Sequence, residues 1–459
     1  MGSNSCFSFF LLSTIIFHSR LIYEVAGDRD PLIGSQREAL EIIIGVGGYT
    51  PAPAPSPLIP PEPICPPPPP PSPPPPFAPP PAKYPPNILR DYKTIQKFKQ
   101  TITIDPMGVT KSWVGYNVCH KYQGFNCASR PDTGVPSVAA INFNGYNFSG
   151  PDFQIQGFVD KLLDLSIFHA NSNGFNGNVP NELDVQNINF LFELDLSNNK
   201  YTGGFPMSVL GATNLTFLDI RFNSFSGPVP REVFNLDLDV LFLNNNQFNQ
   251  QLPDNIGSSP AVYLTFANNQ FSGTIPSSIG RAKNLLEVLF LNNFLTGCLP
   301  YEIGFSKSLT VFDASCNKLT GPIPQSFACL EQMQFLNLAT NEFYGPVPEM
   351  VCKLPHMQNL SLSGNYFTEV GPECRKLIQL NRLDVSNNCI SDLPNQRSEE
   401  TCREFFCNPK QCPNEKSLTI VPCSKNYPSA TAKFYQRSTF AATPPKSYDA
   451  LSPHINFRF

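Results

Sequence analysis

A period of 23 to 26 residues runs through the middle of the 459-residue chain and constrains its fold more than any other feature. Four segments align without gaps: LFELDLSNNKYTGGFP, LTFLDIRFNSFSGPVP, LTVFDASCNKLTGPIP and MQFLNLATNEFYGPVP. One proline per copy keeps the register, at Pro180, Pro206, Pro230, Pro253, Pro276, Pro300, Pro324, Pro348 and Pro372. So regular a spacing indicates one structural unit that repeats.

The consensus of these copies predicts the fold. Each follows L-x-L-x-x-N-x-(L/F)-x-G-x-(I/V/L/F)-P, the signature of a leucine-rich repeat. One coil cannot bury its apolar side, whereas stacked coils share a continuous core. We therefore predict an α/β solenoid, a leucine-rich repeat horseshoe, over residues 137–394, and its G-x-(I/V)-P copies resemble leucine-rich repeats of the extracellular plant type. Alternating residues such as Leu194 and Leu196 should point into the core, and those between them should lie on the concave face.

One asparagine also recurs in each coil. Its side-chain amide can satisfy backbone groups that the tight turn leaves unpaired. We therefore expect a structural role, not a ligand-binding one, for Asn173, Asn199, Asn223, Asn246, Asn269, Asn293, Asn317, Asn341, Asn365 and Asn388.

The chain before the repeats divides into three segments. An apolar run within residues 1–26 is typical of a secretory signal peptide. Residues 27–50 form a polar leader that we expect to be disordered. The segment 51–86 holds 22 of the 49 prolines and should adopt polyproline II as a spacer or, alternatively, a wall-glycoprotein arm. No later run reaches the ~18 apolar residues of a membrane span.

Cysteines and sequons support an exported protein. The chain holds 14 cysteines, which in an oxidising compartment form disulfides. Glycosylation sequons of the form N-x-S/T occur at Asn147, Asn214 and Asn359.

Both ends of the solenoid need caps. Residues 87–136 should form the N-terminal cap, with an amphipathic helix in Ile88–Thr101 and a disulfide between Cys119 and Cys127. Residues 395–459 should form a C-terminal cap and a disordered tail. The cap cysteines that are expected to close this end with Cys389 are Cys402, Cys407, Cys412 and Cys423.

The remaining cysteines leave alternatives open. Cys298 and Cys316 lie about six positions out of phase, roughly 20 Å along the strand direction, beyond disulfide reach. Cys352 is nearly in phase with both Cys329 and Cys374. Cys65, in the proline tract, is the candidate for an unpaired thiol or a disulfide-linked dimer.

Several phrases resemble the plant leucine-rich repeat extensins: WVGYNVC from Trp113, IFHANSNGFNG from Ile167, LDIRFNSFSG from Leu218, DLDVLFLNNNQF from Asp237 and SLTVFDASCNKLTGPIP from Ser308. The resemblance implies a cell-wall protein whose repeats bind basic, cysteine-rich signalling peptides of the rapid alkalinisation factor class. Because the proline tract precedes the repeats, the chain is more similar to the secreted plant repeat proteins with a short proline-rich leader.

Charge supports a basic partner independently. Between residues 138 and 394 there are 22 Asp plus Glu and 12 Lys plus Arg, a net charge of -10, whereas the whole chain carries -4. The repeat phase places acidic and exposed aromatic side chains on the concave face, where they would provide anchors and charge steering. The predicted contact residues are His169, Glu193, Asp195, Phe217, Asp219, Phe222, Phe242, Tyr263, Glu287 and Asp313.

Other functions are less favoured. We find no nucleophile signature, no phosphate loop and no paired metal-binding cysteines, so we expect neither catalysis nor a cofactor nor a metal. The low charge content of 15% argues against a nucleic-acid partner. The alternative function is an inhibitor of pathogen polygalacturonases, which would use the same face. Wall polysaccharide is a further candidate partner, through the proline-rich tract.

Overall fold

The computed structural model describes residues 84–130, 132–179, 190–408, 410–413 and 415–424. They belong to one compact unit, Pro80–Phe459. The expected signal peptide, polar leader, Cys65 and disordered tail lie outside the described residues, as does the proline tract up to residue 83.

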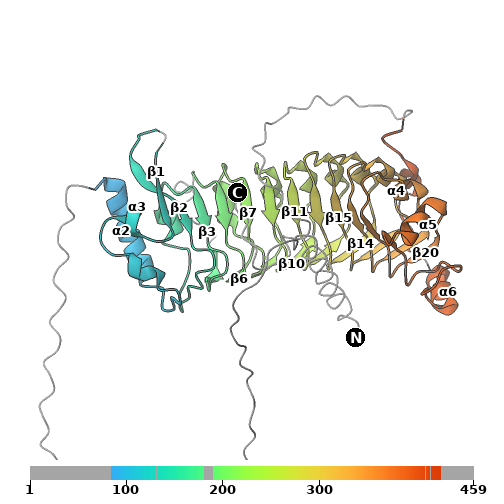
Figure 1. The fold of residues 1–459 in the computed structure, drawn as a ribbon, viewed down its shortest axis with the longest axis horizontal. Coiled ribbons are helices and arrows are strands. Elements are labelled where there is room, and N and C mark those ends of the chain that lie inside the picture. The colour runs from blue at the N-terminus through green and yellow to red at the C-terminus, as the bar shows by residue number, and fades with distance from the viewer. Residues whose placement is uncertain (1–83, 131, 180–189, 409, 414, 425–459) are drawn as a thin grey trace, which may run out of the picture. The chain divides into compact units, whose positions relative to one another are not determined.

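A 12-stranded sheet, which we call the main sheet, runs the length of the solenoid (Figure 1). Its strands pair in parallel one coil apart, except that β1 pairs with β2 in antiparallel fashion. In order, they are β1 (Phe125–Ser129), β2 (Pro136–Asn142), β3 (Ile167–His169), β5 (Glu193–Asp195), β7 (Phe217–Asp219), β9 (Val240–Phe242), β11 (Tyr263–Thr265), β13 (Glu287–Leu289), β15 (Val311–Asp313), β17 (Phe335–Asn337), β19 (Asn359–Ser361) and β21 (Leu383–Asp384).

A second, 9-stranded sheet, the flank sheet, follows the turn of each coil. Its strands are β4 (Asn176–Asn178), β6 (Lys200–Gly203), β8 (Ser224–Gly227), β10 (Gln247–Gln251), β12 (Gln270–Gly273), β14 (Phe294–Cys298), β16 (Lys318–Gly321), β18 (Glu342–Pro346) and β20 (Tyr366–Glu369).

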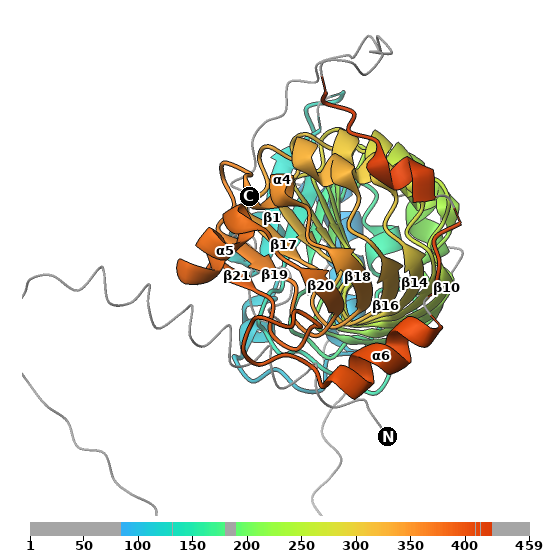
Figure 2. The same cartoon turned by 90° about the vertical axis from the view of Figure 1, so that its right-hand side faces the viewer.

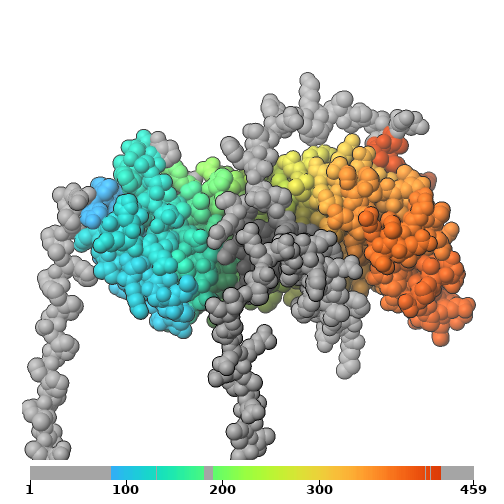
Figure 3. All heavy atoms as spheres, in the orientation of Figure 1, coloured from blue at the N-terminus to red at the C-terminus, as the bar shows by residue number. Residues whose placement is uncertain are grey.

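Short helical segments complete the coils on the remaining side. They are η2 (Val159–Lys161), η4 (Met207–Gly211), η5 (Arg231–Asn235), η6 (Ile256–Ser258), η7 (Ser277–Arg281), η8 (Tyr301–Phe305), η9 (Gln325–Cys329), α4 (Glu349–Cys352) and α5 (Pro372–Gln379). Seen end-on, these segments and the two sheets enclose the core (Figure 2). Successive coils occupy successive bands of the surface (Figure 3). The predicted solenoid is confirmed.

The core is continuous from coil to coil. Leu194, Leu196 and Leu218 are buried in it, as the alternation predicts. Aromatic rings also stack between neighbouring coils of the flank sheet. The centroid of Phe175 lies 6.1 Å from that of Tyr201, and Tyr201 lies 5.9 Å from Phe225. Each coil thus buries apolar surface against the next coil.

Tyr201 is an exception within this aromatic stack, because its buried hydroxyl makes no hydrogen bond. Burial also raises its pKa. Replacing Tyr201 with Phe should therefore raise the free energy of unfolding by about 1 kcal/mol, since an unsatisfied buried hydroxyl carries a desolvation penalty. Denaturant unfolding measures this change. The matched variant Phe225→Tyr should lower stability, and a loss of stability in Tyr201→Phe would contradict the account.

The asparagine ladder has the predicted structural role. In one coil, Asn317 Nδ2 donates to the carbonyls of Phe290, Ala314 and Ser315 at 3.0–3.2 Å, and its Oδ1 accepts from the N–H of Leu295 at 2.9 Å. All ten predicted asparagines donate to the carbonyls of two coils in this way. The ladder therefore ties neighbouring coils together through buried polar bonds.

The N-terminal end is covered by a helix, α2 (Pro86–Lys99), followed by η1 (Val109–Ser112) and α3 (Val118–Lys121). Ile88, Ile95 and Phe98 are buried at its apolar spacing. Phe98 stacks on Phe158 with centroids 3.7 Å apart. Next to this helix, Cys119 and Cys127 form the expected disulfide, with an S–S distance of 1.97 Å.

The C-terminal cysteines form disulfides both within the cap and with cysteines of the repeats. Cys389 bonds to Cys402 in α6 (Glu399–Cys407), one of the four cysteines expected to close this end. Cys412 and Cys423 do not close this end but reach back into the repeats, to Cys298 and Cys329. The segment after α6, which includes η10 (Glu415–Thr419), therefore runs back along the solenoid.

The structure also gives the pairing state of the remaining described cysteines. Cys352 pairs with Cys374, which resolves the two alternatives. Cys407 is the free cysteine within the described part of the chain, and Cys316 is disulfide-bonded.

Candidate ligand-binding face

The concave face consists of the main-sheet side chains that point away from the core. The strand register places Glu193 beside Phe217, and Asp195 beside both His169 and Asp219. Neighbouring parallel strands lie about 4.8 Å apart, so these side chains form one contiguous patch. Within it Glu193 is half-buried, whereas Asp195 and Asp219 are buried, with 7% and 0% of their surface exposed. The predicted grouping of Glu193, Asp195 and Asp219 is thus present at the N-terminal end of the sheet.

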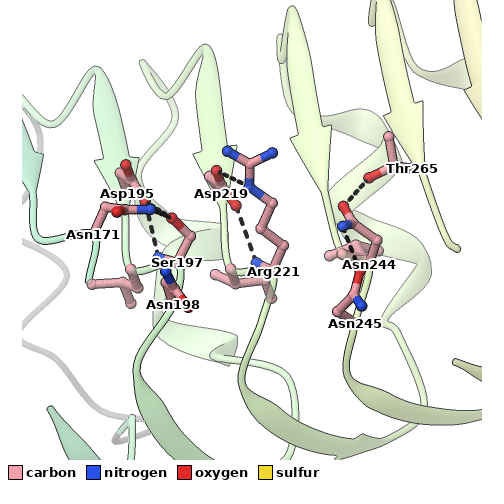
Figure 4. Close-up of polar contacts among 12 residues, drawn as sticks. Asn171, Asp195, Ser197, Asn198, Asp219, Arg221, Asn244, Asn245 and Thr265 are labelled. Atoms are coloured by element: carbon pink, nitrogen blue, oxygen red, sulfur yellow. Dashed lines mark hydrogen bonds and ion pairs between the residues drawn. The ribbon is translucent and has the colours of Figure 1, made fainter. Parts of the chain in front are cut away.

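Each aspartate also caps the turn that follows its strand (Figure 4). Asp195 Oδ1 accepts from the backbone N–H of Ser197 at 2.9 Å and from its hydroxyl at 2.5 Å. Asp219 Oδ1 accepts from the N–H of Arg221 at 3.1 Å. Such bonds to the residue two positions on are Asx turns. At least one oxygen of each carboxylate therefore accepts a hydrogen bond within the fold.

His169 and Glu193 form a pair across β3 and β5, with His169 Nε2 2.8 Å from Glu193 Oε2. Burial lowers the pKa of His169, but the hydrogen bond that its ring donates to Glu193 and the charges of Asp195, Glu193 and Asp219 outweigh this effect and raise that pKa above its usual value. The patch therefore holds a protonated imidazole among three carboxyl groups in mildly acidic solution.

Arg221 is a charged residue that the sequence reading did not select. Its Nε lies 2.9 Å from Asp219 Oδ2, and its guanidinium lies 5.2 Å from the ring centroid of Phe242. Burial raises the pKa of Asp219 to about 7, with the charge of Asp195 adding to it, although Arg221 acts against the shift. The Asp-x-Arg spacing at the end of β7 was the available signal for this pair.

The aromatic side chains on this face are buried, so the expectation that they are exposed was wrong. Phe217, Phe242 and Tyr263 are 6%, 1% and 7% exposed. With Val240 they form an apolar cluster separate from the main core, and Val262 packs against it. Large side chains on adjacent strands shield one another. The pKa of Tyr263 rises to about 12 because of burial and the nearby Glu287.

Phe222 does not lie on the sheet, which corrects a second expectation. It follows β7 in the turn, with φ 51°, where other coils place asparagines such as Asn245 and Asn268. A left-handed backbone is required at this point of the coil, and asparagine adopts it more easily than an aromatic residue.

The last two predicted residues lie further along the face. Glu287 begins β13 and is buried. Asp313 ends β15, where its Oδ1 accepts from the N–H of Ser315 at 2.9 Å and its Oδ2 accepts from Asn337 Nδ2 at 2.9 Å. The carboxylates thus form a group at β3–β7 and a second group at β13–β15.

The described residues include neither a metal-binding cluster nor a membrane-spanning helix. No group of three or more His, Cys, Asp and Glu side chains in that part of the chain has an arrangement that would hold a metal ion. Within the same residues, no helix has the length and apolarity needed to cross a membrane.

Comparisons with known proteins agree with this architecture. The Leucine Rich Repeat family model matches residues 214–236 and 308–330. Leucine-rich repeat extensin-like protein 2 of Arabidopsis thaliana is 39% identical over 160 residues, 34% of this chain and 19% of that protein. Leucine-rich repeat extensin-like protein 4 of the same plant is 41% identical over 158 residues, 34% of this chain and 31% of that protein. The chain therefore spans less than a third of these relatives.

Solved structures show the same fold. The repeat ectodomain of the plant membrane receptor kinase GASSHO1/SCHENGEN3 from Arabidopsis thaliana, in complex with CASPARIAN STRIP INTEGRITY FACTOR 2, superposes with a TM-score of 0.59 at 25% identity over 65% of this chain and 36% of that chain. A plant ice-binding protein superposes with a TM-score of 0.53 at 22% identity, over 68% of this chain and 98% of that chain. The chain is a leucine-rich repeat protein whose repeats are similar to those of the plant leucine-rich repeat extensin-like proteins.

Proposed function

We propose that this chain is a secreted, non-catalytic binding protein of the plant cell wall. Its ligand is a basic, cysteine-rich signalling peptide of the rapid alkalinisation factor type, bound on the concave face. The observation that carries the proposal is the contiguous acidic patch of Glu193, Asp195 and Asp219 on adjacent strands, in which the half-buried Glu193 lies nearest the surface and the two buried aspartates lie beside it. A partner with exposed lysine or arginine side chains complements this patch.

The charge distribution supports this choice of ligand. The repeats between residues 138 and 394 carry 22 acidic and 12 basic residues, a net of -10. A field of one sign over a surface accelerates the approach of an oppositely charged partner and is screened beyond about 8 Å at physiological salt. Glu287 and Asp313, further along the sheet, are buried and add to this field without lying at the surface.

The known structures and relatives support a binding role. A repeat ectodomain with 25% identity to this chain was solved in complex with CASPARIAN STRIP INTEGRITY FACTOR 2. The extensin-like relatives carry the name of a cell-wall protein class, which supports the proposed location. Several concave carboxylates already accept hydrogen bonds within their own turns, which suits a rigid recognition surface better than proton transfer.

Calorimetric titration of the full secreted chain with a panel of basic cysteine-rich peptides tests the proposal. We expect at least one to bind with micromolar or lower Kd, and we expect affinity to fall at least tenfold between 50 and 300 mM salt, because exposed charges are screened. Binding by none of the panel would contradict the proposal. In a parallel assay, fungal polygalacturonase should keep its rate when the protein is added, and inhibition would favour the alternative function.

A further inference from the structure

The three glycosylation sequons lie in different parts of the solenoid. Asn147 is exposed in a turn with φ 54°, and Asn214 is exposed in the segment that leads into β7. Asn359 instead begins β19, so of the three sequons it alone lies on the main sheet, within the concave face. A sugar chain attached there would share a surface with the proposed ligand.

The side chain of Asn359 suits such a modification. The residue is half-buried, and its Oδ1 accepts from the hydroxyl of Ser361, the third residue of the sequon, at 2.8 Å. No described residue accepts a hydrogen bond from its Nδ2. In the same coil, by contrast, Asn365 Nδ2 donates to three carbonyls at 2.9–3.3 Å. Substituting Nδ2 of Asn359 therefore breaks no bond of the fold.

The surroundings of Asn359 also fit a sugar. The strand register places Phe335, a half-buried aromatic, directly beside it on β17. Around the pair lie neutral amides, including Gln334 and Gln358, whose side chains are 3.3 Å apart, and Asn337. A pyranose ring has an apolar face and hydroxyl edges, so an aromatic ring flanked by amide donors and acceptors matches both.

We propose that Asn359 carries an N-linked glycan whose first N-acetylglucosamine packs on Phe335. The glycan covers β17–β21 and confines the ligand to the acidic and apolar side chains between β3 and β13. This second part rests on the proposed function. Two strands, or about 10 Å, separate Asn359 from Asp313, a distance that the core of an N-glycan easily spans. Asp313 is then shielded from the ligand.

The modification requires a lipid-linked oligosaccharide donor of the secretory pathway. Transfer forms a bond between Nδ2 of Asn359 and the anomeric carbon of the first sugar. The bond between that carbon and the pyrophosphate of the donor breaks, the lipid pyrophosphate leaves, and the amide loses one proton. No oxidant or reductant is involved.

Glycopeptide mass spectrometry of the full chain secreted from plant cells tests the first part. The peptide that contains Asn359 should carry an N-glycan in the wild type and in Ser361→Thr, which keeps the sequon. Ser361→Ala should abolish it while leaving the asparagine in place. An unmodified Asn359 peptide in the secreted wild-type protein would overturn the proposal.

Hydrogen exchange with a bound basic peptide tests the second part. In the wild type, protection should appear on β3–β13 and not on β17–β21, whereas in Ser361→Ala it should extend onto β17–β21. Asn147→Gln, which removes an off-face sequon, should behave as the wild type. Ligand protection of β17–β21 in the glycosylated protein would overturn the confinement. If no peptide binds, the proposed function and the confinement fail together, while the mass spectrum still decides the glycan.

Discussion

Replacing Asn269 with alanine is expected to lower the free energy of unfolding by about 3 kcal/mol. Asn269 Nδ2 donates to the carbonyls of Leu243, Phe266 and Ala267 at 3.0–3.1 Å, and its Oδ1 accepts from the N–H of Phe248 at 3.0 Å. Alanine removes all four bonds and leaves buried backbone groups without these partners. A typical buried hydrogen bond contributes about 1 kcal/mol, and a buried partner left without a bond adds a desolvation penalty. Losing four bonds at once therefore destabilises the fold strongly.

Urea unfolding with an unchanged m-value measures this loss. The neighbouring Asn268→Gly is the control, since Asn268 has φ 53°, which glycine adopts freely, and its side chain bonds only to Asn245 and Asn292 among the described residues. We expect this control to lose less than about 1 kcal/mol. Equal losses for the two variants would contradict the role of the ladder.

The protein should unfold at a higher temperature at pH 5 than at pH 8. The pKa of Asp219 is about 7 in the folded protein, because of its burial, against about 4 in an unfolded chain. The folded state therefore holds this proton between about pH 4 and 7, and stability falls as pH rises through that window. The raised pKa of His169 acts in the same direction, because its stabilisation is complete below about pH 6.5 and is lost above its folded pKa.

Together, the titration of Asp219 and His169 should lower the free energy of unfolding by on the order of 2–4 kcal/mol between pH 5 and pH 8. Differential scanning fluorimetry from pH 4 to 8 gives the profile, and Asp219→Asn should flatten it, since the amide keeps Oδ1 for the turn but does not titrate. Asp254→Asn is the control, because Asp254 is exposed and, among the described residues, its one ion pair is with the exposed Arg231 at 3.3 Å. The account fails if Asp219→Asn shows the same slope as the wild type.

The coil architecture could be predicted because the same constraint repeats in every copy. Leu194 and Leu218 occupy the same phase as the buried residues of nine other strands, and each ladder asparagine has the same bonds. If the pattern is ambiguous in one repeat, the equivalent positions of the neighbouring repeats still assign each residue to the core or to the surface. The helix α2 was likewise predictable from the spacing of Ile88, Ile95 and Phe98.

Features that differ between coils could not be read in this way. The bonds of Cys412 to Cys298 and of Cys423 to Cys329 depend on how a non-repeating segment returns along the solenoid. The burial of Phe217 and Phe242 depends on the side chains that adjacent coils place beside them. The Asx turn of Asp195, by contrast, had a signal in the sequence, the serine two positions on, because that spacing suits a side-chain bond to the turn backbone.

The central claim is that the carboxylates at β5 and β7 bind a basic peptide. The most direct test is to titrate that peptide at pH 8, where Asp219 is ionised, into Glu193→Gln/Asp195→Asn/Asp219→Asn, which removes three charges while the amides keep the turn acceptors. We expect affinity at low salt to fall roughly 10–100-fold and to lose much of its salt dependence. The control, Glu302→Gln/Glu331→Gln, removes charge away from the main sheet and should leave affinity within about twofold. Unchanged affinity and salt dependence in the triple variant would contradict the claim.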